Sequence, residues 1–120
     1  MTQLHILSSA LSDRGSKYAV SGAPVRDKSE IETCLKLLKS KKKFAKATHH
    51  SWACLSTTNG LLKQDDGEAG AGMVIARMLE REDRRDHLVI VTRWFGGTKL
   101  GGDRFRRIQD CVRLYLDDIS

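Results

Sequence analysis

The chain has 120 residues, a hydrophobic fraction of 40% and a net charge of +6, which together fit a single folded, basic domain over residues 1–120. No apolar run is long enough to cross a membrane, and no secretory signal opens the chain. The three cysteines are widely spaced and odd in number, so we expect neither a disulfide framework nor a zinc site. Together these features predict a protein of the cytoplasm. The basic excess suits a phosphate-bearing partner, although many basic proteins bind no nucleic acid.

The first quarter of the chain predicts a β-hairpin. Apolar residues recur over residues 3–11 and 17–25, as is typical of two strands. The tetrapeptide Asp13-Arg14-Gly15-Ser16 between them is a turn signal.

A first helix is predicted over residues 29–41. Ser29 and Glu32 have the spacing of a capping box. Apolar residues then recur at helical spacing, at Ile31, Cys34, Leu35 and Leu38. Six lysines lie between residues 36 and 46, and a solvated helix end explains them better than a binding patch.

The remainder alternates strands and helices. We predict a strand over residues 49–56, a loop, a helix over 69–84, a strand at 88–91 buried on both faces, a glycine-rich loop, and a last helix over 103–116 with Asp103 as its N-cap. The order ββαβαβα predicts an α+β fold, an α/β two-layer sandwich.

The glycine-rich loop between the buried strand and the last helix is the strongest candidate site. Glycines let backbone N–H groups approach a ligand, and a helix N-terminus attracts anions. The spacing matches neither a nucleotide-hydrolysis loop nor a dinucleotide fingerprint, and a tight turn beside a solvated basic helix explains it about equally well. The candidate residues for binding nucleic acid or another anion are Arg93, Gly96, Gly97, Lys99, Gly101, Arg104 and Arg107.

Two further motifs carry ionisable groups. Asp65, Asp66, Gly67 and Glu68 precede a predicted helix, where the carboxylates could hold a cation, act as acid and base, or simply favour the positive helix end. The histidines of the 49–50 pair point to opposite faces of a strand, so they are poorly placed to hold one metal ion. We therefore predict no metal and no cofactor. Since no nucleophile signature is present, catalysis is not indicated.

Three segments together resemble the IMPACT family, also called the YigZ or UPF0029 family. They are ATHHSWA (47–53), which contains His49 and His50, DDGEAGAG (65–72) and VIVTRWFGGTKLGGDRF (89–105). The resemblance covers about residues 14–116, and the ending is similar to the eukaryotic branch. It implies a four-stranded sheet packed against helices, similar to domain IV of elongation factor G and to small-subunit ribosomal protein domains.

The resemblance also implies a role in translation control. Eukaryotic members restrain the general amino-acid-control kinase by competing for its activator, and they associate with actin and ribosomes; no enzymatic activity is established for the family. Full-length members also carry an RWD domain that contacts the kinase activator. We expect no RWD domain within these 120 residues, and therefore do not expect kinase regulation by that route.

Three functions follow as hypotheses. The leading one is a non-enzymatic translation regulator that binds the ribosome, RNA or another polyanion through the basic glycine-rich loop. The second is a protein-binding module for actin or the kinase pathway. The third is a small-molecule enzyme whose acidic motif faces the glycine-rich loop. The sequence carries no signal for a membrane or for DNA in particular.

Overall fold

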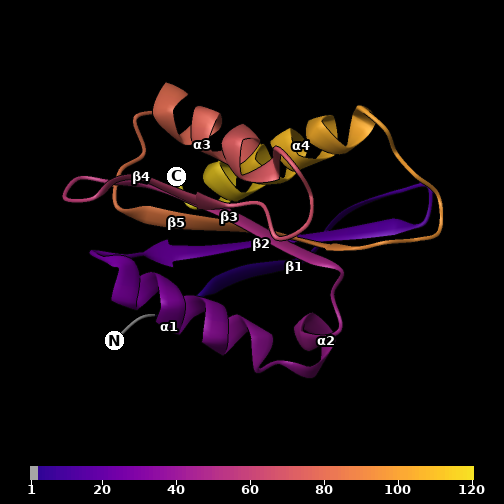
Figure 1. The fold of residues 1–120 in the computed structure, drawn as a ribbon, viewed down its shortest axis with the longest axis horizontal. Helices are drawn as coiled ribbons and strands as arrows, with labels where there is room; N and C mark the ends of the chain where they lie inside the picture. Colours follow the sequence, from indigo (N-terminus) through magenta and orange to yellow (C-terminus); the bar gives the residue numbers. More distant parts are fainter. Residues whose placement is uncertain (1–2) are drawn as a thin grey trace.

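The computed structural model describes residues 3–120, which form a five-stranded antiparallel sheet with helices on both of its faces (Figure 1). The strands lie in the order β1-β2-β5-β3-β4. They are β1 (His5–Asp13), β2 (Ser16–Pro24), β3 (His49–Ser56), β4 (Gly60–Gln64) and β5 (His87–Trp94). The helices are α1 (Lys28–Lys39), α2 (Lys42–Ala45), α3 (Ala71–Arg81) and α4 (Asp103–Asp118). None of these helices is both long enough and apolar enough to cross a membrane.

The α+β class is confirmed, but the two-layer arrangement is wrong. Helices α1 and α2 cover one face of the sheet, and α3 and α4 cover the other (Figure 1). Successive residues of β5 supply both cores, since Val89 and Val91 pack with α3 and α4 while Leu88 and Ile90 pack with α1. This central strand is therefore buried on both faces, as its continuous apolar run predicts.

The prediction of four strands is also wrong, because β4 forms where a loop was expected. Its sequence, Gly-Leu-Leu-Lys-Gln, does not alternate, and it lies between two turn signals. It pairs along the outer edge of β3, from Ser56 opposite Gly60 to Trp52 opposite Gln64. Together with the short helix α2, this strand changes the element order from ββαβαβα to ββααββαβα.

Two predicted helix caps are replaced by neighbouring residues. The α1 N-cap is Asp27, whose carboxylate accepts a hydrogen bond from the Glu30 N–H at 3.0 Å, so the box predicted at Ser29 begins two residues too late. The α4 N-cap is Gly102 rather than Asp103. The Asp103 carboxylate instead accepts a hydrogen bond from Arg14 at 2.6 Å.

The predicted hairpin is confirmed, with a bulge in the edge strand β1. Leu7 lies opposite Val20 and Leu11 lies opposite Tyr18, so three residues of β1 face one residue of β2. Such bulges bend a strand away from its partner and redirect side chains.

A histidine on the α4 side of the sheet should make stability depend on pH. His87 is half-buried, and its Nε2 accepts a hydrogen bond from the Tyr115 hydroxyl at 2.7 Å. Burial, with smaller effects from Arg84 and His5, lowers the pKa of His87 from 6.5 to about 4. The unfolded chain therefore takes up this proton at a higher pH than the folded chain does.

We expect the free energy of unfolding to fall as the pH drops from 6.5 towards 4, and this part of the fall to disappear in His87→Gln, which keeps an acceptor for Tyr115. Urea denaturation at a series of pH values measures it. Equal pH slopes for the two proteins over that interval would contradict the assignment.

Candidate functional site

The glycine-rich loop, the acidic motif and one histidine meet in a single cleft of about 410 Å³. The cleft lies at the end of β5. There the connection to α4 runs beside the β1–β2 turn (Figure 1). Its lining residues come from three segments that are far apart in the sequence: His49, Gly67, Glu68, Ala69, Arg93, Phe95, Lys99, Leu100, Gly101 and Arg104.

A buried ion pair forms part of the cleft wall. Arg93 Nη1 donates to the Glu68 carboxylate, and each of the two residues is only 5% exposed. Two further guanidinium nitrogens of Arg93 lie 3.3 and 3.4 Å from Ser16 Oγ. Arg93 therefore joins β5, the acidic motif and the start of β2, and most of its charge is already neutralised by Glu68.

The other two carboxylates of the acidic motif do not line the cleft. Asp65 accepts hydrogen bonds from the N–H groups of Gly70 at 3.0 Å and Gly72 at 2.8 Å, which lower its pKa and satisfy the start of α3. Asp66 accepts one from the His50 N–H at 2.6 Å. The motif thus joins α3 to β3, and it does not form the acid–base cluster of the enzyme hypothesis.

The two histidines point to opposite faces, as predicted. His49 lines the cleft, with its Nδ1 2.8 Å from the Asp66 carbonyl oxygen. His50 is buried, and its Nε2 donates to the Phe44 carbonyl at 2.9 Å while its Nδ1 accepts from the Thr92 hydroxyl at 2.9 Å. Burial lowers the pKa of His50, so this ring is a neutral structural group.

Cations and an exposed aromatic ring form the rim of the cleft. Phe95 is 47% exposed, and the Arg93 guanidinium lies 5.6 Å from the centre of its ring. Lys99 is exposed, and the half-exposed Arg104 lies 4.5 Å from the ring of Phe105. Phe95 is absent from the sequence-based candidates, although a large apolar residue in a glycine-rich loop next to cations was a signal for it.

Arg107 and the first N–H groups of α4 do not contribute to the cleft as the sequence predicts. Arg107 does not line the cleft, and its guanidinium contacts Asp110 at 3.1 Å and Asp13 at 4.0 Å. The first N–H groups of α4 donate to carbonyls of the loop itself, Asp103 to Leu100 at 3.1 Å and Phe105 to Gly102 at 3.2 Å. An anion in the cleft would therefore meet side chains before it met these backbone donors.

Close packing requires the first glycine of the loop. A Cβ on Gly96 would lie 2.0 Å from the Gly15 carbonyl carbon, because the loop rests against the β1–β2 turn. Gly97 and Gly101 have positive φ angles of 92° and 58°. Backbone geometry alone therefore accounts for three of the four loop glycines.

No metal centre is present in the part of the chain that the structure describes. Among residues 3–120, no group of three or more His, Cys, Asp or Glu side chains lies close enough together to hold a metal ion. The three cysteines are buried and unpaired with one another.

The comparisons with known protein sequences agree on one family. The family model for the Impact N-terminal domain matches residues 14–116. Protein IMPACT of Xenopus laevis is 37% identical over 111 residues, which cover 88% of this chain and 36% of that protein. The IMPACT homolog of Caenorhabditis elegans is 35% identical over 115 residues, which cover 90% of this chain and 45% of that protein. The chain thus spans less than half the length of these relatives.

Two solved structures are similar. The crystal structure of a hypothetical protein superposes with a TM-score of 0.81 at 19% identity, covering 98% of this chain and 62% of that one, and shows the shared fold. The two-domain translational regulator Yih1 superposes with a TM-score of 0.56 at 30% identity, covering 90% of this chain and 44% of that one.

Proposed function

This chain belongs to the family of the Impact N-terminal domain, and on that basis we propose that it is a non-enzymatic regulator of translation that binds RNA, on or off the ribosome, through the cleft. The description of Yih1 as a translational regulator supports the first part of the proposal. Translation takes place in the cytoplasm, so we expect the protein to act there.

One observation carries the RNA-binding part: the cleft combines an exposed aromatic ring with cations that face solvent. Phe95 offers a flat surface, and stacking of a base on such a ring is worth about 1–3 kcal/mol in proteins that bind single strands. Lys99 and Arg104 lie on the same cleft, where they would contact phosphates.

The charge distribution favours a phosphate chain over a small anion. Glu68 neutralises Arg93 at depth, whereas neither Lys99 nor Arg104 forms an ion pair with any of residues 3–120. The positive charge therefore lies at the rim, where a long polyanion can reach it without entering the cleft.

We expect the Lys99→Ala/Arg104→Ala double variant to bind single-stranded RNA more weakly and with a shallower salt dependence. Each phosphate contact to a single strand contributes about 0.7 to the slope of log K against log salt, so loss of two should reduce it by about 1.4. Fluorescence anisotropy with a labelled, unstructured RNA over a range of salt concentrations measures this change.

The matched control is Arg77→Ala/Arg81→Ala, which removes the same charge from exposed positions of α3 that do not line the cleft. An equal loss of RNA affinity in both double variants would show that RNA is attracted only by the net charge of the protein. If the unmodified chain binds no RNA at low salt, the protein-binding alternative replaces this proposal.

A further inference from the structure

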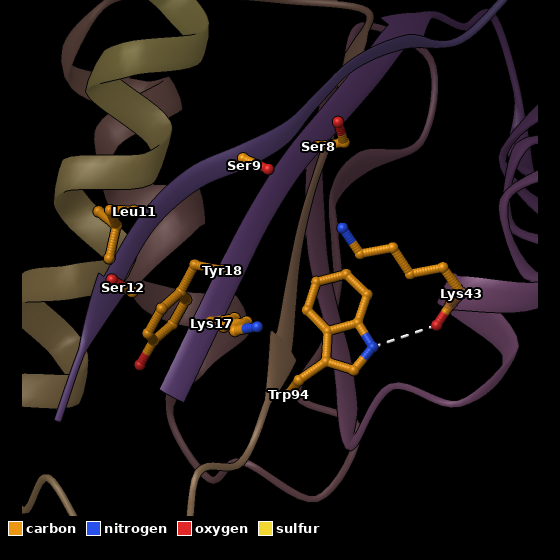
Figure 2. A pocket seen from close by; sticks show the side chains of 8 residues that line it. All are labelled: Ser8, Ser9, Leu11, Ser12, Lys17, Tyr18, Lys43 and Trp94. Atoms are coloured by element: carbon orange, nitrogen blue, oxygen red, sulfur yellow. Dashed lines mark hydrogen bonds between the residues drawn. The ribbon is translucent and has the colours of Figure 1, made fainter. Parts of the chain in front are cut away.

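A second pocket, of about 320 Å³, lies beside the same end of β5 (Figure 2). It is lined by Leu11, Tyr18 and Trp94 together with three serines and two lysines. Arg93 and Trp94 are neighbours on β5, so their side chains point to opposite faces of the sheet. The register confirms this placement, because Tyr18 lies opposite Arg93 and Lys17 lies opposite Trp94. Arg93 therefore lines the cleft, and Trp94 lines the second pocket, together with Lys43 of α2.

Trp94 is held in place at the wall of this pocket. Its indole N–H donates to the Lys43 carbonyl at 3.1 Å, and its ring packs edge-on against Phe44, 5.3 Å between centroids. Lys43 Nζ lies 5.2 Å from the indole centroid. Figure 2 shows the Lys43 side chain extending along the indole, with the hydroxyls of Ser8 and Ser9 nearby on β1.

The bulge of β1 supplies the polar side of the pocket. Residues 8–10 lie between the two registers of the β1–β2 pair, and this irregular segment brings Ser8 and Ser9 to the pocket. Ser12 and Lys17 complete that side. The hydroxyls of β1 are therefore available as hydrogen-bond donors at the pocket.

The donors of the pocket lack acceptors within the protein. Within residues 3–120, no hydrogen bond or ion pair to another protein group is formed by the side chains of Ser8, Ser9, Ser12, Lys17 and Lys43. No carboxylate lines the pocket. Two ammonium groups and three hydroxyls beside a fixed aromatic ring suit a ligand that has both a phosphate and a flat ring.

We propose that this pocket binds a nucleotide, with the base against the indole of Trp94 and the phosphate between Lys17, Lys43 and the serine hydroxyls of β1. The proposal does not rest on RNA binding by the cleft, which uses other side chains on the other face of the sheet. The nucleotide could be a free mononucleotide or part of an RNA strand, and the experiment separates these sources.

The test uses Trp94 as the reporter. Trp52→Phe leaves Trp94 as the only tryptophan, since the chain has two. We expect adenosine 5′-monophosphate to quench its fluorescence in a saturable way, more strongly than adenosine or inorganic phosphate at the same concentration. Lys17→Gln/Lys43→Gln should weaken the affinity for the mononucleotide at least about tenfold, because the loss of even one charge-assisted contact has about this effect.

The control is Lys36→Gln/Lys41→Gln, which removes two exposed lysines that do not line the pocket and should leave the affinity unchanged. If Trp52→Phe does not fold, amide shifts of Ser8, Ser9 and Lys17 in the unmodified chain replace the fluorescence readout. A short RNA that binds this site more tightly than the mononucleotide identifies a strand as the source, and weaker binding identifies the free nucleotide.

The proposal is overturned if neither ligand gives saturable binding, or if the Lys17/Lys43 variant binds as the unmodified chain does. Failure of the cleft proposal looks different. In that case Lys99→Ala/Arg104→Ala leaves RNA affinity unchanged, while the response of Trp94 to the mononucleotide persists.

Discussion

Glu68→Ala should lower the free energy of unfolding by about 3–5 kcal/mol, the usual effect of removing one partner of a buried ion pair. The substitution leaves the guanidinium of Arg93 with only Ser16 Oγ, at 3.3 Å, and without a counter-charge. Because Arg93 packs against Tyr18 and Phe95, with ring centres 5.7 and 5.6 Å away, it cannot reach bulk water without disturbing the cleft. Urea denaturation measures the loss.

The matched control is Glu82→Ala, which removes a glutamate from an exposed pair with Arg113 at 3.2 Å. Exposed pairs of this kind contribute at most about 1 kcal/mol. A second variant, Glu68→Leu/Arg93→Met, removes both charges and should recover part of the stability that Glu68→Ala loses. Equal effects of Glu68→Ala and Glu82→Ala would show that the cleft pair has no special structural role.

Gly96→Ala should lower the free energy of unfolding by about 3 kcal/mol, at the upper end of the usual range for a substitution that overpacks its site. The added Cβ would lie 2.0 Å from the Gly15 carbonyl carbon, 2.2 Å from its oxygen and 2.4 Å from the Ser16 nitrogen. Backbone atoms cannot rotate away as a side chain would, so the loop must separate from the β1–β2 turn. Phe95 and Arg93 would move with it, and we expect RNA binding to weaken as well.

Gly102→Ala is the control within the same loop. Its φ is −65°, and nothing lies within 4 Å of a Cβ built there. We expect a change well below about 1 kcal/mol, from the N-cap position alone. If thermal or urea unfolding gives similar values for the two variants, packing against the hairpin turn does not stabilise the loop.

The sequence was most informative where one strong local signal was present. The continuous apolar run of β5, the Asp13–Ser16 turn and the apolar stripe of α1 each led to the correct element. β4 could not be predicted in the same way, because its side chains do not alternate and its stability comes from hydrogen bonding to β3. The face of the sheet that each helix covers depends on the path of the chain in space. No local sequence pattern reports that path, and the two-layer prediction was therefore wrong.

The candidate site shows a similar division. Asp65 and Glu68 are three residues apart in one motif, yet Asp65 bonds the start of α3 while Glu68 pairs with Arg93, 25 residues away. Spacing cannot reveal that difference, because tertiary packing decides which carboxylate is turned towards the cleft. Residues of the basic loop line the cleft, and that His49 and Glu68 lie beside them emerges only from the fold.

We expect RNA to bind at the cleft, and not along the lysine-rich residues 36–42 from the end of α1 to the start of α2. Nuclear magnetic resonance of the unmodified chain, titrated with a short single-stranded RNA at low salt, tests it most directly by locating the perturbed amides. We predict the largest shifts at His49, Gly67 to Ala69, and Arg93 to Arg104. Shifts concentrated at Lys36 to Lys42, with the cleft unchanged, would contradict RNA binding at the cleft.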